Sequence, residues 1–509
     1  MFKQVTPNPI LWTDGYKFLH KDQYPPNTTW VYETWTPRKS RIDGVTHAVW
    51  FGLQSAMMEI ANQYQVGFFD RPLDVVMNEI ETNFREIYSK TNPQMVENYD
   101  FSHFVALHKL GYLPIMVKSL PEGSFVPIGV PMMTIENTLP EFYWLPGFLE
   151  IVLSNSIWQP TTCATIADKY RRILSRYAKM TGVDTALVAN QAGDFSMRGM
   201  AVPEAAYRAA GGHLLSFNVS STISVREYLK TYYDAGPDVS VYGPSTEHSV
   251  MCAYGPDDEA GVYRRLITEV YPSGNVTIVS DSYDFWGVVE NVLPQIKDEI
   301  LARSGRVGIR PDSGDPVKIL CGDINSDNRF ARRGLVECLW DLFGGSVNTF
   351  GFKELDPHIT AVYGDAITPE RAEAICRGLM EKGFASTNWV PGIGSYTYQY
   401  MTRDTLGFAL KCTAAIIDGK FTPIFKDPKT DTGNLKKSQL GQVAVVFEND
   451  EYRCIDGLRM IDSDYRVIGD QLQTLFKDGE FHRSQSWDSI KDRVRSESAR
   501  VYGKRGGLS

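Results

Sequence analysis

Two stretches of the sequence decide its fold class: NVTIVSDSYDFWGVVENVL (275–293) and VGIRPDSGDP (307–316). In each, a short apolar run rich in β-branched residues ends in a polar turn. The first stretch then continues with an amphipathic segment. This order of strand, turn and helix predicts a sheet that is mainly parallel.

The same pattern recurs on both sides. LLSFN (214–218) precedes the amphipathic SSTISVREYLKTYY, and ITAVYGD (359–365) precedes TPERAEAICRGLMEKGF. About seven such runs end just before Asp194, Phe217, Gly243, Ser280, Arg310, Gly364 and Gly392. This number favours a closed (β/α) barrel, and an open, doubly wound sheet is the alternative that the pattern leaves open.

The two ends of the chain have a different pattern. Before residue 185 it predicts buried helices at 49–60 and 142–158 and a further helix from Thr162 to Gly182. After Asp404 the alternation is typical of antiparallel strands. We therefore predict an α/β barrel from residues 186–404, with residues 1–185 and 405–509 forming a discontinuous, β-rich α+β domain.

Composition excludes several classes of protein. The 509 residues are 43% hydrophobic and 22% charged, which is typical of a globular chain. Lys plus Arg number 52 against 61 Asp plus Glu, and this charge of −9 argues against nucleic acid or an anionic membrane as a partner. The seven cysteines are scattered without a CxxC pair, and no apolar stretch is typical of a signal peptide or a membrane span. We expect a cytoplasmic protein.

The turns after the predicted strands carry most of the residues capable of chemistry. They read DFSMR (194–198), EHS (247–249), SDSYD (280–284), RPDSG (310–314), GD (364–365) and GIGS (392–395). Glycines and hydroxyl residues offer backbone N–H groups to anions, arginines bind phosphates, and carboxylates hold ribose hydroxyls or hydrated Mg²⁺. Any one of these turns could be purely structural. Together they predict a site for a small molecule that contains phosphate and sugar.

These motifs resemble the nicotinamide phosphoribosyltransferase family. TDGYK (13–17), YPPNT (24–28), DFSMRG (194–199), EHS (247–249), VSDSYD (279–284), IRPDSG (309–314), YGD (363–365), TRD (402–404) and FKDP (425–428) follow the order of that family. The resemblance implies a type II phosphoribosyltransferase with an irregular α/β barrel. Such an enzyme transfers phosphoribose from phosphoribosyl pyrophosphate to the pyridine nitrogen of nicotinamide in NAD salvage. It also implies a homodimer with two active sites, each completed by the partner subunit, and Mg²⁺ and ATP as cofactor and co-substrate.

The resemblance assigns the pyridine and ribose contacts. Phe195 resembles the aromatic floor under the pyridine ring, and Tyr16 of the partner subunit resembles its lid. A flat, electron-poor ring gains stacking energy between two such faces. Arg198 resembles a contact to the 5′-phosphate or the ring carbonyl, while Arg310 and Asp312 resemble the pair that positions the ribose and the carboxamide. Ribose, phosphate and other substrate contacts are further implied at Asp14, Thr277, Asp281, Gly364, Asp365, Gly392 and Gly394.

The resemblance also assigns charged groups near the phosphates. Arg403, Lys411 and Lys426 resemble cations that the partner supplies to the pyrophosphate. His248 matches the histidine that the family phosphorylates with ATP, and with Arg310 and Asp312 it is a candidate catalytic residue. The sequence does not identify the ligands of the metal ion.

Ser221 departs from the family. Nicotinamide-specific members carry an aspartate there, which accepts the amide N–H₂ group and repels the carboxylate of nicotinic acid. A serine removes this repulsion and can donate to either substrate, so nicotinate phosphoribosyl transfer is the alternative function. Tyr242 and Thr277 also replace smaller family residues. A catalytically inactive, nucleotide-binding regulator is a second alternative.

Overall fold

The computed structural model describes residues 7–426, 439–459 and 467–503. The chain forms two compact units. The first unit comprises residues 1–165, 230–235 and 402–509, and the second comprises residues 166–229 and 236–401. The first unit is therefore built from the two ends of the chain and the second from its middle.

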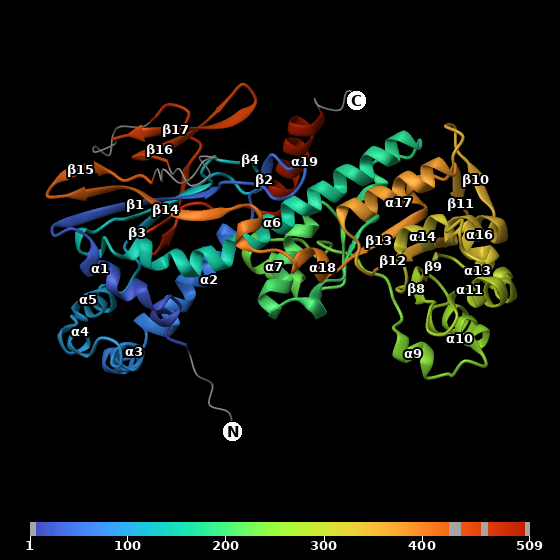
Figure 1. The fold of residues 1–509 in the computed structure, drawn as a ribbon, viewed down its shortest axis with the longest axis horizontal. Helices are drawn as coiled ribbons and strands as arrows, with labels where there is room; N and C mark the ends of the chain where they lie inside the picture. Colours follow the sequence, from blue (N-terminus) through green and yellow to red (C-terminus); the bar gives the residue numbers. More distant parts are fainter. Residues whose placement is uncertain (1–6, 427–438, 460–466, 504–509) are drawn as a thin grey trace. The chain divides into compact units, whose positions relative to one another are not determined.

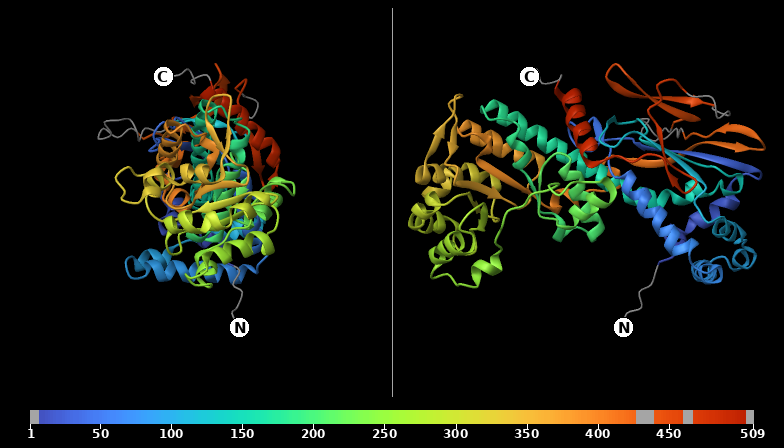
Figure 2. Two further views of the ribbon diagram at one scale, coloured as in Figure 1. Left: turned by 90° about the vertical axis from the view of Figure 1, so that its right-hand side faces the viewer. Right: turned by 180° about the vertical axis from the view of Figure 1, so that it is seen from behind.

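A seven-stranded antiparallel sheet organises the first unit, in the order β15-β14-β1-β5-β3-β18-β19. Strand β1, in blue, lies beside β14, in orange, in the front and rear views (Figures 1 and 2), although the two are far apart in sequence. The strands are β1 (Thr28–Pro37), β3 (Ile115–Ser119), β5 (Met133–Asn137), β14 (Phe408–Ile417), β15 (Lys420–Pro423), β18 (Gln473–Lys477) and β19 (Glu480–Phe481).

The helices of this region differ from those predicted from the sequence. The expected pair at 142–158 and 162–182 is one helix, α6 (Leu145–Met180), which continues through Pro160. A proline usually breaks a helix because it removes a hydrogen bond and adds bulk. The Pro160 ring packs against Gly52, where a Cβ would lie 2.6 Å from the ring. The helix predicted at 49–60 is α2 (Leu53–Tyr64).

A six-stranded parallel sheet organises the second unit, in the order β7-β6-β13-β12-β9-β8. Residues 241–246 link its two edges, because Val241 pairs with Val219 of β7 and Ser245 pairs with Thr277 of β8, both in parallel. This seventh segment closes the sheet into an irregular barrel. The strands are β6 (Gly193–Asp194), β7 (Val219–Ser220), β8 (Val276–Val279), β9 (Val307–Arg310), β12 (Ile359–Tyr363) and β13 (Trp389–Ile393).

Helices follow the barrel strands, as the sequence pattern predicted. They include α7 (Pro203–Leu214), α8 (Ser224–Tyr233), α9 (His248–Cys252), α14 (Pro316–Cys321), α17 (Pro369–Glu381) and α18 (Ser395–Tyr398). The run LLSFN (214–218) is not a strand: α7 extends to Leu214, Phe217 stacks on His213 at 4.9 Å, and the strand begins at Val219. An apolar run this short has no periodicity that separates a helix end from a strand. The predicted α/β barrel with a β-rich domain from both ends of the chain is otherwise confirmed.

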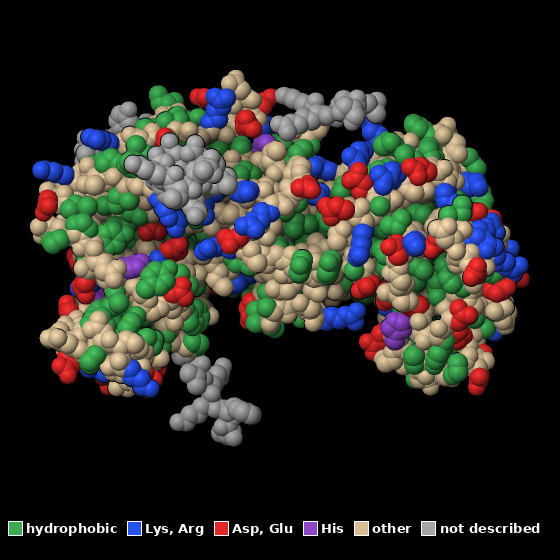
Figure 3. Space-filling view, viewed as in Figure 1, with side chains coloured by type: hydrophobic (Ala, Val, Ile, Leu, Met, Phe, Trp, Pro, Cys, Tyr) green, Lys and Arg blue, Asp and Glu red, His purple; other side chains and the backbone are tan. Residues whose placement is uncertain are grey.

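Charged side chains of both signs are interspersed over the face shown in Figure 3. Within the described ranges, none of the helices combines the length and apolarity needed to cross a bilayer.

Candidate active site at the carboxyl ends of the barrel strands

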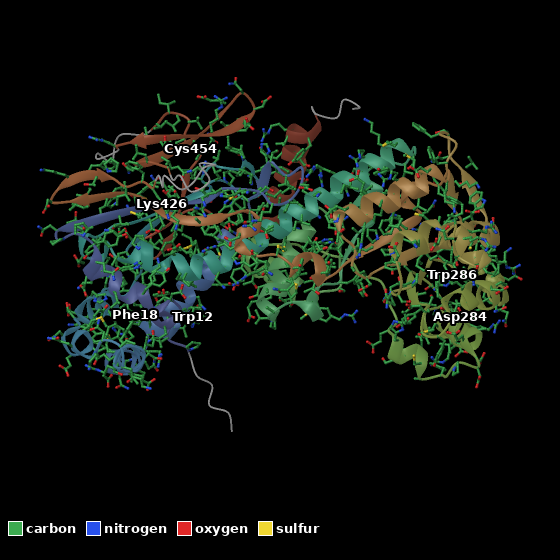
Figure 4. The ribbon with its side chains drawn as sticks, viewed as in Figure 1. Trp12, Phe18, Asp284, Trp286, Lys426 and Cys454 are labelled. Atoms are coloured by element: carbon green, nitrogen blue, oxygen red, sulfur yellow. The ribbon has the colours of Figure 1, made fainter. Side chains whose placement is uncertain are left out.

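The parallel strands of the second unit bring the predicted turns to one edge, because the carboxyl ends of parallel strands point the same way. Phe195 follows β6, Ser221 follows β7, Asp281 lies two residues after β8, and Gly364 follows β12. Asp284 and Trp286, labelled in Figure 4, belong to the turn and helix α11 (Phe285–Gly287) after β8. Gly392 is a strand residue of β13, and Gly394 is the turn residue beyond it.

The guanidinium of Arg310 is held on three sides. Its Nη1 donates to Ser245 Oγ at 2.6 Å and its Nη2 to the Thr246 carbonyl at 3.0 Å, while Nε lies 3.2 Å from Asp312 Oδ2. A planar, permanently charged guanidinium fixed in this way presents its charge at a defined position. The sequence did not single out Ser245 and Thr246, because their importance comes from the position of the linking segment 241–246.

Two carboxylates and His248 lie next to this arginine. Asp281 Oδ2 accepts the backbone N–H of Asp312 at 3.0 Å. His248 Nε2 lies 3.7 Å from Asp281 Oδ1, and its Nδ1 lies 3.3 Å from Ser282 Oγ. The imidazole is half exposed, with 48% of the side chain accessible. The three predicted residues His248, Arg310 and Asp312 are therefore brought together around Asp281.

Burial raises the pKa of Asp312, and the neighbouring carboxylates Asp281 and Asp365 add to the rise. Arg310 and His248 oppose it. A further positive charge placed beside Asp312 would lower its pKa again.

The carboxylates also suit a hydrated cation. Asp281 Oδ1 and Asp312 Oδ1 are both buried and accept no hydrogen bond from the described residues. In the same described ranges, no three His, Cys, Asp or Glu side chains form a complete ligand set. Mg²⁺ keeps several waters and commonly uses one or two carboxylates with substrate phosphates, so this donor pair fits it.

Phe195 lies on glycines at the centre of the rim. Its backbone N–H donates to the Ile393 carbonyl at 2.9 Å. A Cβ on Gly392 would lie 2.4 Å and 2.6 Å from Cδ2 and Cε2 of the ring, and 2.9 Å from Gly364 Cα. Tyr242 meets the ring edge-on, with centroids 5.9 Å apart at 74°. Glycine at 392 therefore makes room for the aromatic ring.

Asp194 is a buried hub that ties β6 to β7. Its Oδ1 accepts from Ser196 Oγ at 2.6 Å, and its Oδ2 accepts from Ser220 Oγ at 2.9 Å and Thr222 Oγ1 at 2.8 Å. Its carbonyl accepts both the N–H of Ser221, at 2.9 Å, and the Oγ–H of Ser221, at 3.0 Å. The sequence did not single out these contacts, and the hydroxyl residues of SSTIS (220–224) are the signal that could have indicated them.

Arg198, Asp365 and Gly394 lie at the same edge, whereas Thr277 lies inside a strand. Arg198 is exposed in η6 (Met197–Gly199), three residues after Phe195, and Asp365 is exposed after β12. Gly394 precedes α18 with open space around its Cα. Thr277 lies within β8, and its hydroxyl closely approaches Gly308 of β9.

The remaining predicted residues belong to the first unit. Tyr16 is half exposed in η2 (Gly15–Leu19), after the exposed Asp14. The ammonium of Lys17 lies 5.5 Å from the centroid of the Tyr16 ring and 2.5 Å from Glu150 Oε2. This buried ion pair restrains the segment that carries Tyr16.

The predicted cations of the first unit are also exposed. Arg403 begins η10 (Arg403–Thr405), Lys411 lies in β14, and Lys426, labelled in Figure 4, follows β15. Lys411 is one residue from the partner of Glu33 in the β1–β14 register. Burial and then Glu150 raise the pKa of Glu33 to about 7, with Lys17 and Lys411 opposing.

The fold and site define the class of protein. The structure of nicotinate-nucleotide pyrophosphorylase from Pyrococcus furiosus superposes with a TM-score of 0.57 over 100% of this chain and 99% of that one, at 14% identity. Human nicotinic acid phosphoribosyltransferase gives 0.54 over 96% and 94%, at 16% identity. The fold is that of the type II phosphoribosyltransferases.

Sequence comparison identifies the family within this class of enzymes. Residues 190–480 match the nicotinate phosphoribosyltransferase (NAPRTase) family, and residues 8–117 match the N-terminal domain of nicotinamide phosphoribosyltransferase. The nicotinamide phosphoribosyltransferase of Acinetobacter baylyi is 41% identical over 96% of this chain and 97% of its own. That of Mycoplasma pneumoniae is 34% identical over 83% and 92%. The chain belongs to the nicotinamide phosphoribosyltransferase family of enzymes.

Proposed function

We propose that this enzyme transfers phosphoribose from phosphoribosyl pyrophosphate to the pyridine nitrogen of nicotinamide, giving nicotinamide mononucleotide and pyrophosphate in NAD salvage. The observation that carries the proposal is that Phe195, Gly364, Gly392 and Arg310 all lie at the carboxyl ends of the parallel strands, with Asp312 Oδ2 3.2 Å from Arg310 Nε. An aromatic face therefore lies on the same edge of the sheet as a fixed cation and carboxylates. The seven free cysteines suit a reducing, cytoplasmic setting.

The reaction is a displacement at C1 of the ribose. The lone pair of the pyridine nitrogen forms the new C1–N bond, and the C1–O bond to pyrophosphate breaks with its electrons leaving on oxygen. The nitrogen carries no proton, so no general base is needed. Phe195 holds the ring, while the Arg310 guanidinium, fixed by Ser245 and Thr246, supplies positive charge close to the reacting sugar phosphate.

Mg²⁺ fits beside Asp281 and Asp312, whose Oδ1 atoms accept no hydrogen bond from the described residues. When bound, it supplies positive charge that stabilises the departing pyrophosphate. Asp281 also orients the backbone of Asp312.

We further propose that ATP phosphorylates His248 and that this stimulates transfer. The surroundings of the imidazole support the proposal. Its Nε2 lies 3.7 Å from Asp281 Oδ1, and about half of the side chain is accessible to solvent and so to ATP. In the step, an imidazole nitrogen bonds the γ-phosphorus of ATP, the P–O bond to ADP breaks, and water later releases phosphate.

We also propose a homodimer with shared sites. Support comes from the half-exposed Tyr16 and from Tyr396 and Tyr400, exposed at 52% and 79% and stacked at 5.4 Å. A mixing experiment tests it: Phe195→Ala and Tyr16→Ala proteins, each nearly inactive, are unfolded and refolded together. Shared sites restore activity to about a quarter of the wild-type value, because half of the random dimers have one intact site. No recovery would exclude sharing.

The main proposal is tested with purified protein, phosphoribosyl pyrophosphate and Mg²⁺. Nicotinamide mononucleotide and pyrophosphate should form in equal amounts. Nicotinate is the second candidate substrate, because Ser221 replaces the amide-selecting aspartate. The ratio of kcat/KM for the two pyridines decides between them, and no product from either would favour the inactive regulator.

A further inference from the structure

A cavity of about 520 Å³ lies in the first unit, at the start of the C-terminal helix α19 (Trp487–Gly503), which is dark red in Figure 1. Among the described residues that line it, none is acidic. Its walls include two arginines, three serines and a glutamine: Arg483, Arg493, Ser484, Ser486, Ser489 and Gln485. The lining is therefore polar and carries positive charge only.

The two guanidinium groups are held by neutral oxygens. Arg483 donates to the carbonyls of residues 119 and 120, both at 3.2 Å. Arg493 donates to the Glu122 carbonyl and, at 3.3 Å, to Gln485 Oε1. Within the described ranges neither arginine forms an ion pair. Two permanent charges therefore face this cavity without a carboxylate paired to either of them.

The nearby carboxylate of Glu122 is engaged elsewhere. It is buried, and its two oxygens accept the backbone N–H groups of Gly52, at 3.0 Å, and Gln54, at 2.6 Å. Burial raises the pKa of Glu122, which weakens it as a counter-charge. Burial also lowers the pKa of Arg483, and Arg493 lowers it further against the opposing effect of Glu122. Positive charge is thus in excess beside the cavity.

Two N–H donors of the lining residues lack an acceptor. Gln485 is only 7% exposed, and its Oε1 accepts from the Glu122 N–H at 3.0 Å and from Arg493. These two donors identify that atom as the oxygen, so Nε2 is the donor of the amide. Nε2 of Gln485 and Nε of Arg483 are both buried and donate to none of the described residues. A ligand with several acceptor oxygens would satisfy such donors.

Helix α19 adds a further positive contribution. The first N–H groups of a helix have no partner within it, and the helix dipole favours negative charge at this end. Ser486 directly precedes the helix, and its Oγ accepts the Ser489 N–H at 3.4 Å, a long hydrogen bond. The acidic residue of the first turn, Asp488, is exposed and does not line the cavity.

We propose that this cavity is a binding site for a phosphate-bearing anion, with Arg483, Arg493, Gln485 and the start of α19 as its donors. A phosphate group combines negative charge with several acceptor oxygens, and a guanidinium can bind two of these oxygens at once. The site is independent of the proposed transfer reaction, because all of its residues belong to the first unit and none was predicted as a substrate contact.

The test measures binding of inorganic phosphate and of pyrophosphate by titration calorimetry without Mg²⁺. The protein carries Arg310→Ala throughout, which removes the fixed cation of the barrel rim and so separates the two sites. Added Arg493→Gln should weaken anion binding by roughly ten- to hundredfold, the effect of one charged hydrogen bond.

A second variant guards against loss of folding. Ser489→Glu places a carboxylate at the third residue of α19, where glutamate after Ser486 completes a capping box and stabilises the helix. Its melting temperature should therefore be unchanged or higher. Anion binding should nevertheless weaken by roughly tenfold or more, because the new charge repels the ligand.

Arg495→Gln is the matched control. It removes the same charge from the same helix, but Arg495 is exposed, pairs with Asp492 at 3.3 Å and does not line the cavity. Binding should be unchanged in this variant. Tighter binding of pyrophosphate would identify a ligand that meets both arginines, and equal binding would identify a single phosphate group. The proposal is overturned if neither anion binds, if Ser489→Glu and Arg493→Gln bind as well as the Arg310→Ala parent, or if Arg495→Gln loses as much affinity as they do.

Discussion

Replacing Gly392 by alanine should displace the aromatic floor of the site. The added Cβ would lie 2.4 Å from Cδ2 of Phe195, whereas unbonded carbons rest about 3.5 Å apart or more, so the ring must move by about 1 Å. The same Cβ would also lie 2.9 Å from Gly364 Cα, so a second group crowds it. Overpacking of this kind costs about 1–3 kcal/mol of stability.

A displacement of about 1 Å in a positioning group can cost about a hundredfold in rate, so kcat/KM for nicotinamide should fall between about ten- and a hundredfold. Steady-state kinetics and thermal melting measure the two effects. Gly236→Ala is the matched control: its Cβ would meet no atom within 4 Å, and its φ lies outside the left-handed region. In a Phe195→Ala background the Gly392→Ala change should cost little further activity. Wild-type kinetics for Gly392→Ala, or equal losses at 392 and 236, would refute the reasoning.

Two further predictions concern titratable groups. His248→Ala should abolish stimulation by ATP and leave slow ATP-independent transfer, measured as product formed with and without ATP; surviving stimulation would contradict the proposed phosphorylation. For Glu33, the folded pKa of about 7 exceeds the ordinary 4.5, so the native state binds its proton more tightly and stability falls as pH rises from about 4.5 through 7. The difference corresponds to about 3 kcal/mol. Glu33→Gln should therefore raise the free energy of unfolding in urea at pH 8 and change it little at pH 4.5, and equal effects at both values would show that Glu33 does not titrate in this range.

The sequence alone determined the class of fold and most of the rim. Strand, turn and helix alternate locally, and local periodicity is what a single sequence displays. The polar turns at 194–198, 280–284 and 310–314 therefore could be assigned to one edge before any contact was known. The resemblance to a family rested on these turns and on motifs near both ends of the chain, such as YPPNT (24–28) and FKDP (425–428).

Contacts between distant residues were decided only by the tertiary structure. Gly52 packs against the Pro160 ring of α6, although it lies more than a hundred residues earlier in the chain. The run that ends before Gly243 was predicted as a barrel unit, but only the tertiary structure shows that residues 241–246 pair with both edges of the sheet and hold Arg310. The hydrogen bond of Ser221 to the Asp194 carbonyl, at 3.0 Å, joins residues that are 27 positions apart. Close approach and the choice of hydrogen-bond partner follow from chain packing in three dimensions, which residue order does not display.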